Sequence, residues 1–75
     1  MALITLSAVI HREGNLYVAD CPELGTVSQG ATIEEAISNL KEATELYLEE
    51  QTGPVAVAPA ILTTFSVDAA NAEAA

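Results

Sequence analysis

Apolar and polar positions alternate with a period of two at the start of the chain. In residues 3–11, the side chains that fall on one side of an extended backbone are those of Ile4, Leu6, Ala8 and Ile10. Several polar residues occupy the other side. This alternation is typical of a strand with one buried face. The pattern therefore predicts a strand over residues 3–11.

Two shorter strands are expected to follow in a meander. Arg12-Glu13-Gly14-Asn15 has the chemistry of a turn, because glycine and asparagine tolerate a positive φ. Residues 16–20 then form the returning strand of a hairpin. The proline in segment 21–25 cannot donate a hydrogen bond to a sheet, so this segment ends the strand. Residues 26–29 form a short third strand.

The hydrophobic period changes to that of a helix after Gly30. Thr32-Ile33-Glu34-Glu35 is a capping box, in which the Thr32 hydroxyl accepts a hydrogen bond from the Glu35 amide. An apolar stripe follows, and acidic residues occupy the opposite side. The stripe consists of Ile33, Ala36, Ile37, Leu40, Ala43, Thr44, Tyr47 and Leu48. The spacing predicts a helix over residues 33–51, with Gly53 in a left-handed cap.

The segment after the helix has three parts. Residues 54–60 are apolar, but two prolines keep them out of the middle of a sheet. Residues 61–67 alternate again and predict a last strand. One face of that strand consists of Ile61, Thr63, Phe65 and Val67. Residues 69–75 carry no large apolar side chain and are expected to form a disordered tail.

These elements define an α+β fold in the order β-β-β-α-β, within one domain over residues 1–68. One amphipathic helix can cover one face of a sheet, so two layers are expected. A right-handed crossover through the helix brings strand 61–67 beside strand 3–11, which completes a four-stranded sheet. The predicted core consists of Ile4, Leu6, Ala8, Ile10, Val18, Ile33, Ile37, Leu40, Tyr47, Phe65 and Val67.

Charge and length restrict the possible partners. The 75 residues include 11 acidic and 2 basic side chains, which gives a formal net charge of −9. Nucleic acids and anionic membranes attract basic proteins, so neither is expected to bind this chain directly. A basic protein is the complementary partner. A domain of this size buries only about 60% of its unfolded surface, so association into a dimer or tetramer is also expected.

The residue types offer little for cofactors or membrane insertion. One cysteine, Cys21, cannot form an internal disulfide, and with one histidine, His11, it cannot complete a zinc site of the usual kind. No run of about 18 apolar residues is present. The apolar start lacks the basic flank of a signal peptide. We therefore expect a cytoplasmic protein that carries no cofactor.

A long pattern of short motifs occupies residues 16–50. A hairpin ends in Cys-Pro-Glu-Leu, and Ser-Gln-Gly and Thr-x-Glu-Glu-Ala follow it. Asn-Leu-Lys-Glu-Ala and Glu-Leu-Tyr-Leu-Glu close the pattern. These five pieces stand at positions 21–24, 28–30, 32–36, 39–43 and 45–49. In this order and spacing, the chain closely resembles the HicB family of type II antitoxins.

This resemblance implies a partial RNase-H-like fold, in agreement with the β-β-β-α-β order above. It also implies a place in a toxin–antitoxin system, because HicB proteins bind and neutralise HicA, a small basic RNase. The acidity of this chain suits such a partner. Many family members carry a C-terminal DNA-binding domain. This chain resembles the short stand-alone members, so operator binding is not expected.

RNase H chemistry needs a cluster of carboxylates that holds two Mg²⁺ ions. The candidates here are Asp20 and Asp68, but solvation of strand ends explains their positions, and strand 3–11 has no acidic residue. His11 at a strand end and Cys21 before a proline also need no reactive role. We therefore expect no enzyme activity and no catalytic or metal-binding residue.

Partner-binding residues are expected on two surfaces. Leu46 lies off the apolar stripe of the helix and could be an apolar anchor inside an acidic rim. Tyr17 is expected on the sheet face opposite to its core-facing neighbours, where a partner could contact it. The candidate binding residues are Tyr17, Asp20, Glu23, Glu34, Glu42, Glu45, Leu46 and Glu49. The candidates for contact with a second subunit are Val55 and Val57.

Three functions are considered on the basis of these observations. The main hypothesis is a non-catalytic, antitoxin-type protein-binding module that neutralises a basic HicA-like RNase toxin by occlusion. The alternative is an orphan HicB-like homo-oligomer with no toxin partner, which the small core and the apolar segment 54–60 favour. A residual nuclease that uses Asp20, Asp68 and Mg²⁺ is a third alternative.

Overall fold

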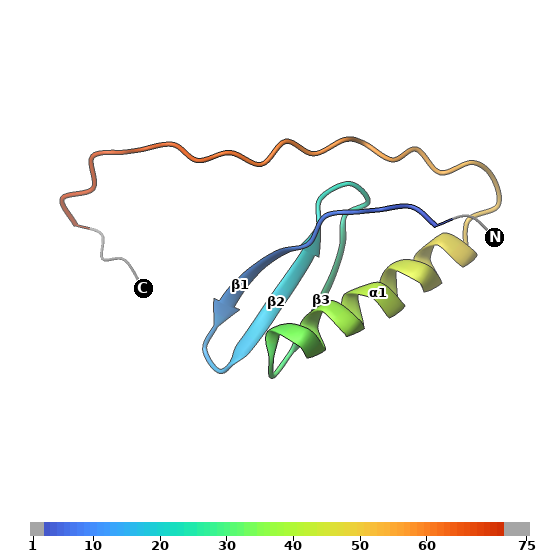
Figure 1. The fold of residues 1–75 in the computed structure, drawn as a ribbon, viewed down its shortest axis with the longest axis horizontal. Coiled ribbons are helices and arrows are strands. Elements are labelled where there is room, and N and C mark those ends of the chain that lie inside the picture. The colour runs from blue at the N-terminus through green and yellow to red at the C-terminus, as the bar shows by residue number, and fades with distance from the viewer. Residues whose placement is uncertain (1–2, 72–75) are drawn as a thin grey trace.

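The computed structural model describes residues 3–71 of the chain. Within this range it contains three strands, β1 (Val9–Glu13), β2 (Leu16–Cys21) and β3 (Thr26–Gly30), followed by one helix, α1 (Ile33–Glu49). The strands form an antiparallel sheet in the order β1-β2-β3. The helix packs on one face of this sheet, over β3 and β2 (Figure 1). The predicted α+β class and the meander of the first three strands are confirmed.

The hairpin between β1 and β2 is tighter than predicted. Glu13 pairs with Leu16, so the turn consists of Gly14 and Asn15, and Arg12 belongs to β1. Gly14 has a φ of 60°. A positive φ at the first central position suits a type II′ turn, which matches the twist of the flanking strands and favours glycine there.

The first strand begins at Val9 instead of residue 3. Val9 pairs with Asp20, and β2 ends one residue later at Cys21. Pro22 and the turn after it leave no strand backbone with which residues 3–8 could pair. The predicted start of this strand is therefore wrong.

The two ends of α1 are capped in different ways. Thr32 has an extended backbone, and its Oγ1 accepts a hydrogen bond from the Glu35 amide at 3.0 Å, as the capping box predicts. At the other end the helix stops at Glu49, two residues before the predicted end. Glu50, in an ordinary right-handed conformation, closes the last turn by donating to carbonyls within it. Gly53 has no positive φ, so the predicted left-handed cap is wrong.

The core lies between β2, β3 and α1, and small side chains bring these elements together. Gly30 lies so close to the start of α1 that a Cβ at this position would be 2.6 Å from the Ala36 amide nitrogen. Ala36 and Ala19 are fully buried across this contact. The buried residues are Ala19, Cys21, Gly30, Ala36, Leu40 and Thr44.

Polar side chains tie α1 to β3 along its length. Thr26 Oγ1 and Thr44 Oγ1 lie 2.7 Å apart as a hydrogen-bonded pair. The Asn39 side-chain amide donates to the Gln29 carbonyl at 2.8 Å. These bonds satisfy polar groups at the interface of helix and strand, so burial there leaves no unpaired hydroxyl.

The sheet face that carries the core is the opposite of the one predicted for the second strand. Ala19 and Cys21 are buried, and Tyr17 packs against the core with them. Val18 and Asp20 therefore lie on the other face, which no described helix covers. Ala19 and Cys21 are the small side chains on this face of β2, and their size allows the helix to approach beside Tyr17.

Most of the predicted core residues are consequently exposed or only half-buried. Leu40 is 5% exposed and is the one predicted core residue that is buried among the described residues. Three others, Leu6, Ile10 and Val18, are half-buried. The predicted core residues that are exposed are Ile4, Ala8, Ile33, Ile37, Tyr47, Phe65 and Val67. The predicted core is wrong for these residues because the sheet on which they were expected to pack is narrower than predicted.

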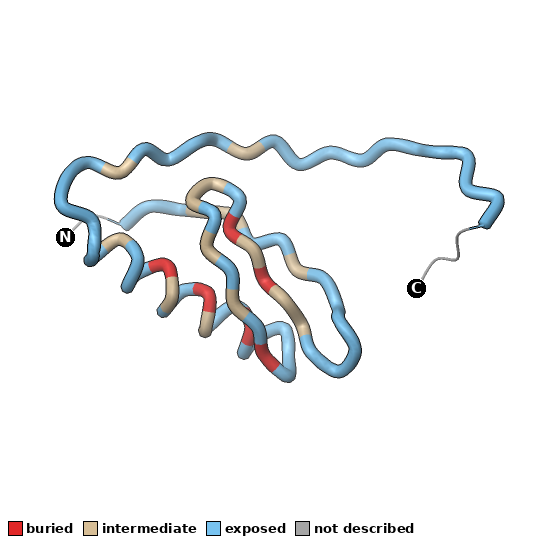
Figure 2. Tube along the Cα trace, turned by 180° about the vertical axis from the view of Figure 1, so that it is seen from behind, coloured by how far each residue is buried: buried red, intermediate tan, exposed pale blue. Residues whose placement is uncertain are grey.

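Residues 54–71, called the arm below, take the place of the predicted fourth strand. The arm runs past the β2–β3 turn and then away from the sheet (Figure 1). Nearly all of it is exposed (Figure 2), and residues 61–67 form no strand. The arm stretches the molecule to 49 Å and its radius of gyration to 15.0 Å, where a compact chain of this length has about 11 Å.

The straightness of the arm has a local cause. Its two prolines restrict the backbone to extended conformations, and no glycine, asparagine or aspartate lies between residues 54 and 67 to form a turn. One backbone hydrogen bond, from the Ala58 amide to the Glu23 carbonyl at 3.4 Å, joins the arm to the sheet. A four-stranded sheet is therefore absent from residues 3–71.

The predicted tail begins at the end of the arm. Residues 69–71 are exposed, and residues 72–75 of the predicted tail lie outside the described residues. Among residues 3–71, no helix has both the length and the apolar character needed to cross a membrane.

Candidate partner-binding surfaces

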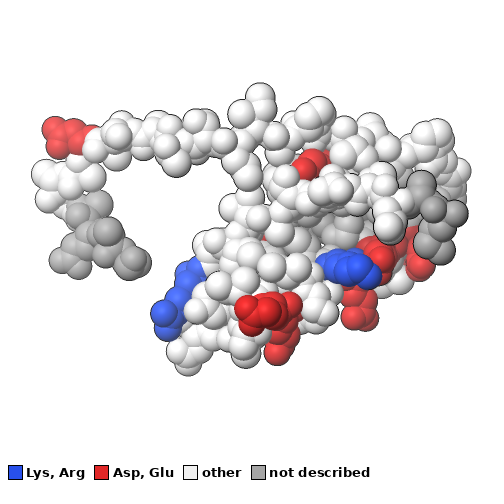
Figure 3. Space-filling view, viewed as in Figure 1, with Lys and Arg blue, Asp and Glu red and all other residues white. Residues whose placement is uncertain are grey.

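The outward side of α1 carries most of the acidic residues that the sequence singles out. This side, called the acidic face below, consists of Glu34, Glu42, Glu45, Leu46 and Glu49, all of which are exposed. Figure 3 shows acidic side chains gathered along the helix, with a basic side chain among them. Lys41 is the basic residue of α1, and its Nζ lies 3.1 Å from Glu45 Oε2. The acidic face therefore retains a net negative charge.

Leu46 interrupts this charge with an apolar side chain that is 55% exposed. It borders a shallow hollow of about 250 Å³, whose other lining residues are Asn39, Glu42 and Ala43. Such a hollow can receive a small apolar group or the aliphatic stem of a basic side chain, while the carboxylate of Glu42 remains at its edge. The predicted exposure of Leu46 among acidic residues is confirmed.

Glu23 has a different place from the one expected of a free acidic donor. Its two carboxylate oxygens accept hydrogen bonds from the Ser7 amide at 2.9 and 3.0 Å. Cys21 Sγ lies 3.5 Å from one of them. Hydrogen bonds from Ser7, above all from its side chain, lower the pKa of the Glu23 carboxyl. Desolvation acts in the opposite direction, but the net effect is a lowered pKa. The Glu23 carbonyl also accepts from Ala58, so this residue holds both the segment before β1 and the arm.

Tyr17 and Asp20 lie on opposite faces of the sheet. Tyr17 is half-buried against the core on the helix side, which corrects the prediction that it faces away from the core. Asp20 lies on the open face beside His11. A partner that binds the acidic face of α1 would therefore not reach Asp20 at the same time.

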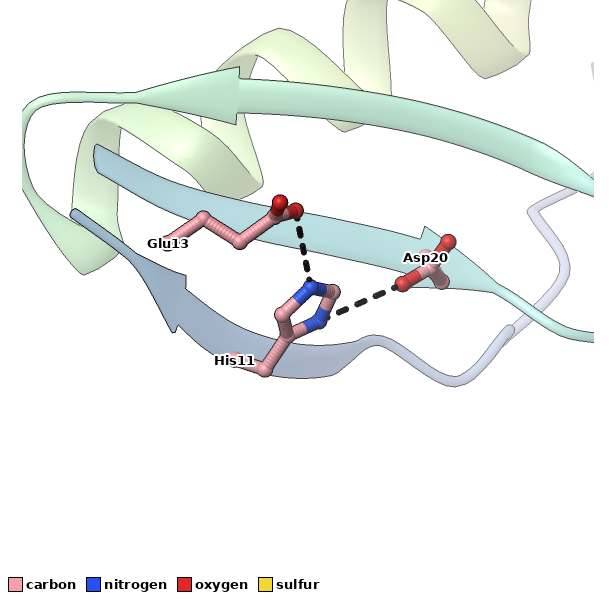
Figure 4. A network of polar contacts seen from close by, with 3 residues as sticks. All are labelled: His11, Glu13 and Asp20. Atoms are coloured by element: carbon pink, nitrogen blue, oxygen red, sulfur yellow. Dashed lines mark hydrogen bonds and ion pairs between the residues drawn. The ribbon is translucent and has the colours of Figure 1, made fainter. Parts of the chain in front are cut away.

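His11 on the open face lies between two carboxylates (Figure 4). Its Nε2 is 3.1 Å from Glu13 Oε2, and its Nδ1 is 3.7 Å from Asp20 Oδ2. The side chains of His11 and Glu13 are more than half exposed and that of Asp20 is 41% exposed. An ion pair in such surroundings contributes about 0–1 kcal/mol.

The two aspartates considered for nuclease chemistry lie in different parts of the structure. Asp20 is on the open sheet face, and Asp68 is exposed near the end of the arm. Among residues 3–71, no three side chains of histidine, cysteine, aspartate or glutamate are grouped so that they could hold a metal ion.

An apolar groove beside the core is a feature that the sequence pattern did not indicate. It has a volume of about 350 Å³ and lies between the segment before β1 and one flank of α1. Leu3 and Ile4 line one wall, and Ile37 and Leu48 line the other. Ile37 is 43% exposed although it belongs to the apolar stripe of the helix. Its exposure depends on the width of the sheet, which the sequence pattern does not give.

Val55 and Val57, the candidates for contact with a second subunit, lie at the start of the arm. Val55 is half-buried and Val57 is 42% exposed. The larger apolar side chains of the arm lie further along and are more exposed, and Phe65 is 86% exposed. The sequence pattern had assigned Phe65 to the core because it alternates with polar residues.

Two known proteins are similar to part of this chain. A UPF0150 protein of Helicobacter pylori strain J99 is 54% identical over 44 residues, which cover 57% of this chain and 61% of that protein. A UPF0150 protein of Synechocystis is 62% identical over 34 residues, which cover 44% of this chain and 43% of that protein. The chain thus spans less than two thirds of these relatives. No protein-family model matches it, and no solved structure matches it significantly.

Proposed function

We propose that this chain is a HicB-like antitoxin, a non-catalytic and cytoplasmic module that neutralises a small basic HicA-like RNase by occlusion. The acidic face of α1 carries this proposal. It combines four exposed carboxylates with an exposed leucine and a hollow beside it. The net charge of −9 means that the chain as a whole also has a negative electrostatic potential. This potential favours encounter with a basic protein.

The parts of the acidic face have different roles in binding. An exposed carboxylate contributes little to affinity by itself, because water screens it. Leu46 supplies the apolar contact that a partner can bury, and the surrounding carboxylates select a basic partner and accelerate its association. A basic RNase uses its cationic side chains to hold RNA. An acidic protein that occupies those side chains excludes the RNA from them, which is the proposed mechanism of neutralisation.

The RNase-H-like, four-stranded fold belongs to this proposal as well. Residues 61–67 keep the alternation of a strand, and their apolar side chains are exposed. The outer edge of β1 has no strand beside it among residues 3–71. A fourth strand at this edge would cover both features.

Co-expression with any small basic protein encoded beside this chain tests the proposal. We expect the two proteins to co-purify and their complex to dissociate as the salt concentration rises. We also expect this chain to block RNA cleavage by the partner. The double substitution of Glu42→Lys with Glu49→Lys should weaken the complex at least tenfold by titration calorimetry. Leu46→Ala should weaken it as well, because the partner loses its apolar contact.

A matched control separates the acidic face from general charge. Glu13→Lys changes an exposed carboxylate on the hairpin and should leave the affinity within about threefold. Circular dichroism should show unchanged helix content in all variants, since these residues are exposed. Absence of a complex with a basic neighbour, or an equal loss with Glu13→Lys, would contradict the proposal.

The exposed arm favours an alternative function, that of an orphan HicB-like homo-oligomer with no toxin partner. A second copy of the chain can bury the exposed apolar residues of the arm. Purification from the native cell followed by mass analysis discriminates the two functions. A complex that contains only this chain supports the alternative, and a stoichiometric basic partner supports the antitoxin.

A further inference from the structure

We propose that two copies of this chain exchange their arms, so that residues 61–67 of each copy form a fourth strand on the β1 edge of the other. This inference goes beyond the proposed function, because it concerns the chain without any toxin. It assigns residues 61–67 as the donor strand and assigns the β1 edge, together with the groove beside it, as the acceptor.

The acceptor is a sheet edge with an apolar space next to it. β1 is an outer strand of the β1-β2-β3 sheet, so its outer backbone groups are available to a further strand. The groove of about 350 Å³ lies past the start of β1, between the segment before β1 and α1, and exposes Leu3, Ile4 and Ile37. A strand that pairs with β1 and continues along the segment before it would place every second side chain on the groove side.

The donor has the pattern that the acceptor requires. Residues 61–67 alternate, and their larger apolar side chains are mostly exposed: Ile61 is 90% exposed and Phe65 is 86% exposed. These two side chains are four residues apart and fall on the same face of a strand. Pairing with the β1 edge would give the backbone N–H and C=O groups of the arm hydrogen-bond partners. It would also bury this face against Ile37 and its neighbours.

The geometry favours a second copy over the same chain. The Ala58–Glu23 hydrogen bond holds the arm at the β2–β3 turn, and the arm then continues away from its own sheet (Figure 1). To reach its own β1 edge the chain would have to bend sharply after Pro59, where it has no residue that favours a turn. An arm that is held at its base and straight beyond it is the arrangement that allows exchange between protomers.

The distribution of charge along the chain permits this contact, although the net charge is strongly negative. Residues 51–67 contain no charged side chain, so an exchanged arm adds no like charge to the partner. The acidic faces of the two helices repel each other and would stay apart. Reciprocal exchange buries the same surfaces in both copies around a twofold axis, which closes the assembly as a dimer.

Sedimentation equilibrium of the full chain, without toxin, tests the exchange. We expect a dimer at micromolar concentration. Phe65→Asp places a charge on the buried face of the donor strand and should raise the dimer dissociation constant at least tenfold. Thr64→Asp adds the same charge to the opposite face one residue away and should change it less than threefold. Because the arm lies outside the core, circular dichroism should show unchanged helix content in both variants.

Isotope-filtered NMR distinguishes exchange from pairing within one chain. In a mixed sample of ¹³C-labelled and unlabelled full chains, we expect nuclear Overhauser effects between the Phe65 ring of one chain and residues 9–13 of the other. A monomeric wild type, a dimer unaffected by Phe65→Asp, or contacts between arm and β1 confined to one chain would each overturn the proposal. None of these outcomes bears on toxin binding at the acidic face.

Discussion

The two halves of this molecule use their apolar residues in opposite ways. The closed half, which consists of β2, β3 and α1, buries small residues such as Ala19 and Ala36 against each other. The open half, which consists of residues 3–13 and the arm, carries large apolar residues such as Phe65 and Leu3 that remain exposed. The chain thus holds its fold together with little apolar volume and leaves much of its apolar surface exposed.

This difference follows from how closely the layers approach. Gly30 and the alanines allow α1 to lie directly on β3 and β2, so few large side chains fit between them. The sheet is only three strands wide, and α1 extends an apolar flank beyond it. A narrow sheet under a long helix therefore produces both a tight contact and an open groove in the same small domain.

The largest expected effect on stability comes from the closed half. Leu40→Ala removes the largest buried aliphatic side chain and should lower the free energy of unfolding by about 2–5 kcal/mol. Ile37→Ala, one turn earlier and 43% exposed, should cost about 1 kcal/mol, because half of this side chain already contacts water. Urea unfolding at low protein concentration measures both. An Ile37→Ala cost that grows with concentration would show that the groove beside Ile37 is covered in solution.

A smaller but sharper effect is expected at the contact of strand and helix. A Cβ at position 30 would collide with backbone atoms of Glu35 and Ala36, so Gly30→Ala should cost about 1–3 kcal/mol. Gly53 has no atom within 4 Å of an added Cβ and no positive φ. Gly53→Ala should therefore be neutral or stabilise by about 0.4–1 kcal/mol. Thermal unfolding compares the two, and equal effects would contradict the close packing at Gly30.

The smallest effect concerns the residue that joins the two halves. The pKa of the Glu23 carboxyl is lowered in the folded state. Its contribution to stability is therefore present above the unfolded pKa, near 4.5, and is lost as the pH falls through the lower folded pKa. Glu23→Gln should reduce the urea midpoint at pH 7, and the difference should shrink at pH 3. Glu42→Gln on the exposed acidic face serves as the control and should leave the urea midpoint at pH 7 nearly unchanged.

Local patterns in the sequence were sufficient for much of the closed half. The hairpin turn at Gly14, the Thr32 cap and the long helix each depend on neighbouring residues, and the structure confirms them. The outward acidic face with Leu46 also follows from helical spacing, because 3.6 residues per turn decide which side chains point away from the stripe. These features do not require knowledge of what packs against the helix.

Features that depend on distant residues were not predictable in the same way. Both faces of β2 carry apolar residues, so alternation could not decide whether Val18 or Ala19 faces the helix. Asp20 shares the face of Val18 and could have indicated that this face is open. The Ser7–Glu23 hydrogen bonds join residues 16 positions apart, and nothing in the local pattern of either segment indicates them.

The sequence by itself determined the meander, the helix with its N-terminal cap, the strong acidity and the strand-like alternation of residues 61–67. Only the tertiary structure decided which face of the sheet is buried, how wide the sheet is and where the arm lies. The physical reason is that turns, caps and periodicity are set by residues within a few positions of each other. Burial and strand pairing depend instead on which surfaces can approach, and here Gly30 and Ala19 permit that approach on one side of β2 only.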